Sequence, residues 1–166
     1  NVNCDLIFAL PKQTPDRWKE NLRRAIALQP QHISAYALIV EDQTPLAMMV
    51  KDKLVHPLPD EDDAEQYQIT IDTLRENGYE QYEVSNFAHN GFECKHNINY
   101  LNHSNYISFG PSAHSFWKDS PVTGKRWWNV RSVQSYCSDI DSGKYPVVGQ
   151  EHIDERKMFN EEVFLG

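Results

Sequence analysis

The stretch that decides the fold is Cys-Asp-Leu-Ile-Phe-Ala-Leu-Pro, residues 4–11. Residues 4–10 are almost continuously apolar and stop at Pro11, which predicts a short strand buried on both faces, as in a parallel sheet. Asp5 is the exception in this run, because an unpaired buried carboxylate is costly. At the carboxyl end of a parallel strand it would point toward the face where ligands bind. A buried Asp5 paired with a backbone amide or an arginine is an equally good interpretation.

The segment that follows predicts a helix and then a second strand. Thr14 and Pro15 provide an N-cap and a first-turn proline, and the helix is expected to end near Pro30. Its apolar positions recur at helical spacing: Trp18, Leu22, Ala25 and Ile26. Residues 32–40 form another apolar run of strand length. The order strand, helix, strand predicts a right-handed βαβ unit with parallel strands, and hence an α/β fold.

The rest of the chain predicts further elements with weaker patterns. These are a short helix at residues 44–50, a helix from the acidic run 60–63 to Gly78, a strand at 79–87, an aromatic strand at 127–130, a helix at 132–140 and a last helix from about Asp154. Acidic side chains favour the positive end of the helix dipole, so the acidic run indicates a solvated helix start rather than a metal site.

Composition excludes several classes of function. A chain of 166 residues can bury a core as one domain, and its net charge of −8 disfavours nucleic acid as a partner. No apolar run approaches the roughly 20 residues of a membrane span, so we expect a cytoplasmic protein. Its three cysteines, Cys4, Cys94 and Cys137, are too widely spaced for a disulfide framework or a metal knuckle. Both ends of the sequence interrupt expected elements, which suggests a longer natural chain.

Residues 94–117 gather an unusual number of polar groups: His96, Asn97, Asn99, Tyr100, Asn102, His103 and His114. If the first part is helical, His96 and Tyr100 share a face at i and i+4, and both residue types serve as axial ligands of heme iron. Alternatively Asn97 caps a helix, His96 bonds a carbonyl and Tyr100 packs, and the local pattern alone favours this second interpretation. For His114, ligand contact and a buried structural histidine are equally good interpretations.

Six segments, taken in order, carry a family likeness. They are Asp-Leu-Ile-Phe-Ala-Leu-Pro-Lys-Gln-Thr (5–14), Pro-Leu-Pro-Asp-Glu-Asp (57–62), Tyr-Glu-Val-Ser-Asn-Phe-Ala (82–88), His-Asn-Ile-Asn-Tyr (96–100), Gly-Pro-Ser-Ala-His-Ser (110–115) and Trp-Asn-Val-Arg (128–131). Together they resemble the oxygen-independent coproporphyrinogen III oxidase-like radical SAM family, and in particular its heme chaperone branch.

The resemblance implies an α/β fold made of the last βα units of a partial radical SAM (β/α)6 barrel, followed by an α+β extension. It divides the chain into the barrel part at 1–88, the extension with the His-Asn-x-x-Tyr motif at 89–150, and the start of a truncated C-terminal helical domain at 151–166.

The resemblance also implies cofactors. The parent protein would use SAM, a [4Fe–4S] cluster and heme, none of which we expect this fragment to hold by itself. The family's cluster-binding cysteines lie upstream, so no residue here is assigned to cluster metal. Asp5 and Ile39 correspond to SAM contacts, and His96, Asn97 and Tyr100 to heme contacts, with His96 a possible ligand of heme iron.

The function implied is heme binding and delivery on a radical SAM scaffold. The alternative is an oxygen-independent coproporphyrinogen III oxidase, and a third interpretation is an α/β metabolic domain with structural histidines. Catalytic residues are unassigned, enzymatic activity is left open for the parent, and the fragment alone is expected to be inactive. Expected partners are heme, heme-accepting proteins and a second copy across an open barrel edge. Ala9 stands where relatives usually have Gly, so its methyl either narrows the SAM pocket or is absorbed.

Overall fold

The computed structural model describes residues 1–165, which group into two compact units divided between Glu93 and Cys94. The first unit contains a four-stranded sheet in the order β1-β2-β4-β3. Its strands are β1 (Asn3–Phe8), β2 (His32–Ala37), β3 (Glu80–Gln81) and β4 (Asn86–Ala88). β1 and β2 pair in parallel, as the sequence predicts, whereas β4 runs antiparallel to both β2 and β3.

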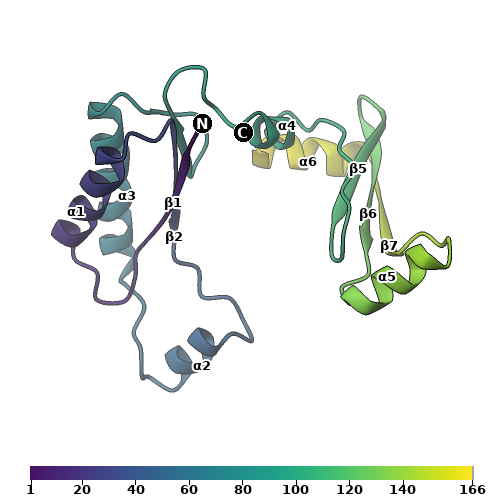
Figure 1. Ribbon diagram of the computed structural model, residues 1–166, viewed down its shortest axis with the longest axis horizontal. Coiled ribbons are helices and arrows are strands. Elements are labelled where there is room, and N and C mark those ends of the chain that lie inside the picture. The colour runs from purple at the N-terminus through teal and green to yellow at the C-terminus, as the bar shows by residue number, and fades with distance from the viewer. Residues whose placement is uncertain (166) are drawn as a thin grey trace. The chain divides into compact units, whose positions relative to one another are not determined.

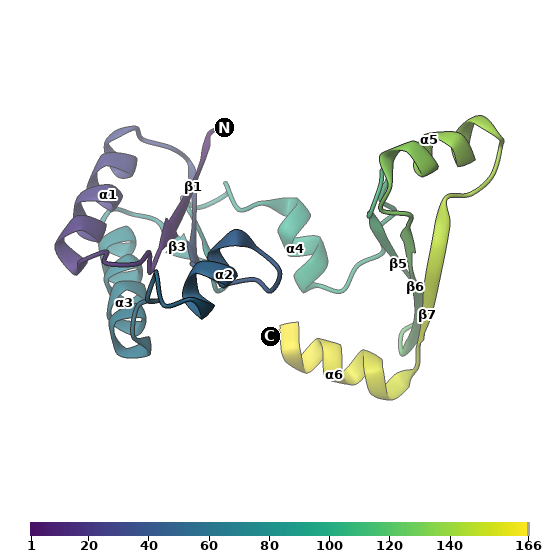
Figure 2. The same cartoon turned by 90° about the horizontal axis from the view of Figure 1, so that it is seen from below.

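Three helices belong to the first unit: α1 (Pro15–Ala27), α2 (Pro45–Lys51) and α3 (Asp60–Glu76). The side chains of Thr14 and Thr44 cap α1 and α2 by accepting hydrogen bonds from backbone amides two or three residues into each helix. α1 and α3 pack together against one face of the sheet (Figures 1 and 2). The core between these layers includes Phe8, Trp18, Leu22, Ile33, Leu74, Tyr79 and Phe87.

The prediction that the first strand is buried on both faces is wrong. Cys4, Leu6 and Phe8 pack into the core, but Asn3, Asp5 and Ile7 on the opposite face are exposed. The reason is that both large helices of the unit lie over one face of the sheet, so alternate residues of β1 are uncovered. The strand also ends at Phe8, because Ala9 turns the chain with a positive φ of 56°.

The predicted strand at 79–87 is instead an antiparallel hairpin of β3 and β4. The Glu83 carboxylate accepts hydrogen bonds from the Ser85 amide at 2.9 Å and from the Asn86 side chain, which closes the turn. The acidic run before this hairpin does lie in the first turn of α3, which confirms it as a helix start.

The second unit contains an antiparallel sheet of β5 (His114–Ser120), β6 (Thr123–Asn129) and β7 (Val147–Ile153), in that order. Its helices are α4 (Lys95–Leu101), α5 (Val133–Asp141) and α6 (Glu155–Leu165). A small core of Phe116, Ile153 and Met158 joins α6 to the sheet. β7 was not predicted, because Gly149 and the polar residues after it weaken the strand pattern. A side chain on Gly149 would come within 2.4 Å of the Trp128 indole.

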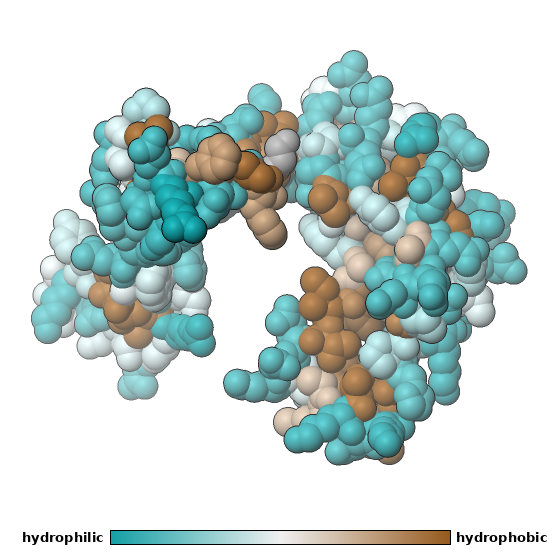
Figure 3. Space-filling model, turned by 180° about the vertical axis from the view of Figure 1, so that it is seen from behind, coloured by the Kyte–Doolittle hydropathy of each residue, from teal (hydrophilic) through white to brown (hydrophobic). Residues whose placement is uncertain are grey.

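Exposed apolar side chains also mark the first unit. Hydrophobic residues gather over the part that carries α2 (Figure 3), where Met48, Met49 and Leu54 are exposed. Among residues 1–165, no helix has both the length and the apolar composition needed to cross a membrane.

Candidate functional site

The His-Asn-x-x-Tyr motif forms most of α4, so the prediction of a helical arrangement is confirmed. His96 and Tyr100 meet edge to face, with ring centroids 4.8 Å apart and planes at 89°. His96 is exposed, whereas Asn97 and Tyr100 are half-buried. The N-cap position belongs to Cys94, so the alternative in which Asn97 caps the helix is wrong. One helix face therefore presents an open imidazole beside a phenol.

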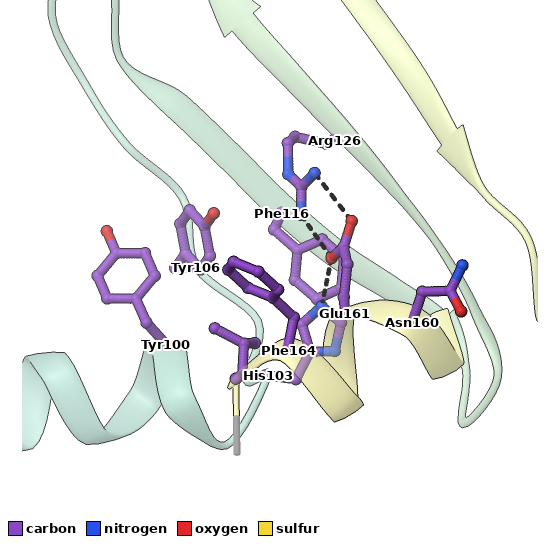
Figure 4. Close-up of a pocket in the computed structure, with 9 residues that line it drawn as sticks. Tyr100, His103, Tyr106, Phe116, Arg126, Asn160, Glu161 and Phe164 are labelled. Carbon is purple, nitrogen blue, oxygen red and sulfur yellow. Dashed lines mark hydrogen bonds and ion pairs between the residues drawn. The ribbon is translucent and has the colours of Figure 1, made fainter. Parts of the chain in front are cut away.

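Tyr100 lines a pocket of about 510 Å³ within the second unit (Figure 4). Its walls are mainly aromatic and aliphatic, with four polar side chains among them. The lining residues are Tyr100, His103, Tyr106, Phe116, Arg126, Asn160, Glu161, Phe164 and Leu165. Mostly apolar walls with a few convergent polar groups are typical of sites for small organic ligands.

The inner wall of the pocket is held by backbone pairing. Tyr106 forms an isolated antiparallel bridge with Phe116, and each amide donates to the other's carbonyl at 2.9 Å. The Tyr100 ring packs on Tyr106 with centroids 4.5 Å apart. The motif helix α4 is thereby connected through two tyrosines to the buried ring of Phe116 on β5.

A charged cluster lies beside Phe116 in the same pocket. Arg126 of β6 donates to both carboxylate oxygens of Glu161 on α6, at 3.1 and 2.7 Å. The hydrogen bond to Glu161 raises the pKa of Arg126 against the opposing effect of burial. Burial raises the pKa of Glu161, but Arg126 and His103 together lower it below its usual value. The pair is therefore ionised throughout the neutral range.

His103 completes this cluster, at the end of α4. It is 6% exposed, lies flat on Phe116 with centroids 4.6 Å apart, and shares a 2.9 Å hydrogen bond between Nε2 and Glu161 Oε2. Its backbone has a positive φ of 50°, which is uncommon outside glycine. The buried Nδ1 atom has no hydrogen-bond partner among the described residues.

The residues predicted to contact SAM lie in the first unit. Asp5 is in the middle of β1 rather than at its carboxyl end. It is exposed, and its Oδ1 accepts a hydrogen bond from the Asn3 side-chain Nδ2 at 2.6 Å. Ile39 follows the end of β2 and is 72% exposed. The expectation that Asp5 is buried is therefore wrong.

A buried histidine adjoins this polar strand face. His32 Nδ1 lies 2.7 Å from Asn3 Oδ1, and His32 Nε2 lies 2.7 Å from the Tyr82 hydroxyl. Burial lowers the pKa of His32, although the charges of Asp5 and Glu83 oppose this effect. The face is therefore an organised set of neutral and acidic groups beside Asp5.

Clusters of potential metal ligands are absent from residues 1–165. Nowhere in that range do three or more His, Cys, Asp or Glu side chains gather in a way that could hold a metal ion. Cys4, Cys94 and Cys137 are not joined in disulfides.

His114 lies apart from the pocket lining. It is exposed and stacks on Trp128, with ring centroids 5.7 Å apart, so its interpretation as a buried histidine is wrong. Sequence reasoning missed Arg126 and Glu161. Arg126 immediately precedes the two tryptophans of the strand predicted at 127–130, which was a usable signal, whereas Glu161 required knowledge of how α6 packs.

Comparison with known proteins places this geometry in context. No protein-family model matches the chain. Over 166 residues it is 34% identical to the heme chaperone HemW of Bacillus subtilis, covering all of this chain and 42% of that protein. It is 35% identical to HemW of Lactococcus lactis over 167 residues, again covering all of this chain and 42% of the relative. The chain thus spans about two fifths of the length of these relatives.

A solved structure gives the fold. Coproporphyrinogen III oxidase (HemN) from Escherichia coli, described as a radical SAM enzyme, matches with a TM-score of 0.71 at 20% identity. The match covers 97% of this chain and 38% of that one. The prediction of a partial radical SAM fold is confirmed.

Proposed function

This chain is homologous, over its whole length, to part of the heme chaperone HemW, and on that premise we propose that it supplies heme contacts for a heme-binding and heme-delivering protein. The observation that carries the proposal is the pairing of His96 and Tyr100 on one face of α4, with Tyr100 opening into an aromatic pocket. An exposed imidazole can reach heme iron from outside, while the phenol and pocket walls accept a planar ring.

The roles of the motif residues follow from their exposure. His96 is the proposed iron ligand, because its imidazole is open to a large ligand. Tyr100 is the second proposed contact, since it lies between His96 and the pocket. Asn97 is half-buried in the same helix and is proposed to support the bound heme by hydrogen bonding.

The test is a heme titration of the full-length protein followed by the Soret band. His96→Ala should lower both the intensity of the band and the affinity for heme. His114→Ala is the matched control, because His114 is also exposed but lies on β5 against Trp128 rather than on α4 against Tyr100. Unchanged heme binding in His96→Ala would remove that residue from the site.

SAM contact remains a separate proposal for Asp5 and Ile39. Asp5 offers a carboxylate on an uncovered strand face, suited to a ribose hydroxyl, and Ile39 offers exposed apolar surface after β2. SAM and a [4Fe–4S] cluster are proposed for the longer protein, where the cluster would supply the electron for SAM cleavage. Asp5→Asn should weaken SAM binding measured by calorimetry in that protein, without changing the Soret band.

The alternative function is oxidative decarboxylation of coproporphyrinogen III, which the likeness in fold to HemN favours. Product analysis on the cluster-reconstituted full-length protein separates the two. Conversion of the substrate's propionates at catalytic rates would support the oxidase, and its absence together with heme binding would support the chaperone. A cytoplasmic location, heme-accepting partners and dimerisation through the open barrel edge also remain predictions.

A further inference from the structure

The pocket that Tyr100 lines contains a site in which two side chains bind a carboxylate. Glu161 Oε2 lies 2.7 Å from Arg126 Nη2 and 2.9 Å from His103 Nε2, while Oε1 lies 3.1 Å from Arg126 Nη1. Two side chains from β6 and from the end of α4 thus define where a carboxylate is bound. In the structure the chain's own Glu161 occupies that position.

The donors of this site are held firmly. His103 is more than nine-tenths buried and stacks on Phe116. The Arg126 guanidinium lies 5.7 Å from the centroid of the same ring, where cation–π attraction adds to the ion pair. Both donors therefore keep their positions around Phe116 whichever carboxylate they bind.

The acceptor is less firmly held than the donor His103. Glu161 comes from α6, whose packing on the sheet centres on Met158, and the side chain is 27% exposed. Phe164, one turn further along α6, lines the same pocket and is 91% exposed. The Arg126 side chain is about as exposed, at 26%, so the comparison that burial supports is with His103: Glu161 can turn toward water at a smaller cost than the buried His103 would pay.

We propose that this pocket binds the propionate of a tetrapyrrole, with Arg126 and His103 as the carboxylate donors and Glu161 as the internal group that the ligand displaces. The inference rests on the proposed heme-binding function and adds a second anchor to it. Exchange of one carboxylate for another keeps the half-buried guanidinium paired, and the planar fork of Arg suits bidentate binding. The ring system would lie against Tyr100, Tyr106 and Phe164.

A role in stability alone and a role in binding predict different responses. If the Arg126–Glu161 pair only supports the fold, removal of either charge weakens heme binding in the same direction. If Glu161 competes with the ligand, Glu161→Gln tightens heme binding because the neutral amide is a poorer partner for Arg126. Arg126→Gln then weakens it. Changes of opposite sign in heme affinity in the two variants would therefore indicate displacement of Glu161 by the ligand.

The experiment compares iron protoporphyrin IX with the same porphyrin carrying both propionates as amides, titrated into the full-length protein. The wild type should bind the dicarboxylate roughly tenfold more tightly, the scale of a charge-assisted hydrogen bond. Arg126→Gln should abolish this preference and Glu161→Gln should enlarge it. Arg24→Gln is the control, because Arg24 pairs with Glu20 in the first unit, outside the pocket lining, and should leave the preference unchanged.

The outcomes separate this inference from the function on which it rests. Equal binding of both porphyrins by the wild type would overturn the carboxylate site while leaving heme binding intact, and needs no variant to fold. A change in heme affinity of the same sign in Arg126→Gln and Glu161→Gln would also overturn the carboxylate site. If neither porphyrin binds the wild type, heme contact itself is refuted, and this inference with it.

Discussion

Glu161 of α6 and Arg126 of β6 form a two-point ion pair, with the carboxylate oxygens 3.1 and 2.7 Å from the guanidinium nitrogens. This pair connects the last helix to the middle strand of the second sheet, beside the small core at Phe116. It is thus both a structural link of the unit and the polar end of the pocket.

The contribution of this ion pair to the free energy of unfolding should fall in the acid pH range. Because the pKa of Glu161 is lowered in the folded protein, its contribution is complete above the ordinary pKa of 4.5 and is lost as pH falls below that value. Glu161→Gln should lower the free energy of unfolding by about 1–2 kcal/mol at pH 7. Urea unfolding at pH 7 and pH 3 checks this; a difference from wild type that persists at pH 3 would contradict it.

His32 should make the first unit sensitive to milder acid. Its pKa is lowered by burial, so below the ordinary value of 6.5 the unfolded chain binds the proton more readily than the folded one. Stability should therefore fall as pH drops below 6.5, and His32→Asn should reduce this dependence. Urea unfolding at pH 7.5 and 5.5 measures this change in the free energy of unfolding, and His114→Asn, at an exposed histidine, is the control. An equal change in the wild type and both variants would refute the role of His32.

Gln66 joins the turn after β1 to α3. It is fully buried, accepts a hydrogen bond from the Ala9 amide at 3.1 Å and donates to the Gln13 carbonyl at 3.0 Å. Gln66→Leu leaves both backbone groups unpaired and should cost about 2–4 kcal/mol of unfolding free energy. Gln68→Leu, on the exposed side of the same helix, should change it by less than about 0.5 kcal/mol. Chemical denaturation of both variants provides the comparison.

The methyl of Ala9 is accommodated by packing, because Ala9 belongs to the buried core of the first unit. Its positive φ costs about 1–2 kcal/mol, but glycine there would lose buried methyl contacts and gain unfolded-state entropy. Ala9→Gly should therefore change stability by less than about 1 kcal/mol, whereas Ala9→Val should cost about 2 kcal/mol or more. Thermal unfolding checks both; a tolerated valine would contradict the backbone assignment.

Local patterns in the sequence were sufficient to predict much of the fold. The Thr-Pro starts of α1 and α2, the acidic start of α3 and the parallel pairing of β1 with β2 all depend on nearby residues. The same is true of the His96–Tyr100 contact, which follows from i, i+4 spacing on α4.

Features that depend on distant packing were beyond sequence reasoning. The exposure of Asp5 depends on which face of the sheet the helices cover. The carboxylate site depends on β7, whose register places α6 so that Glu161 reaches a residue 35 positions earlier in the chain. No periodicity in residues 147–161 carries that information, because the pairing partner determines it.

Hydrogen–deuterium exchange of the full-length protein with and without heme tests most directly whether α4 and the adjoining pocket contact heme. We expect heme to slow exchange in residues 95–106 and 155–165, which carry the motif and the helix that lines the pocket. Slowing confined to residues 1–93, with no change in α4 or α6, would contradict it.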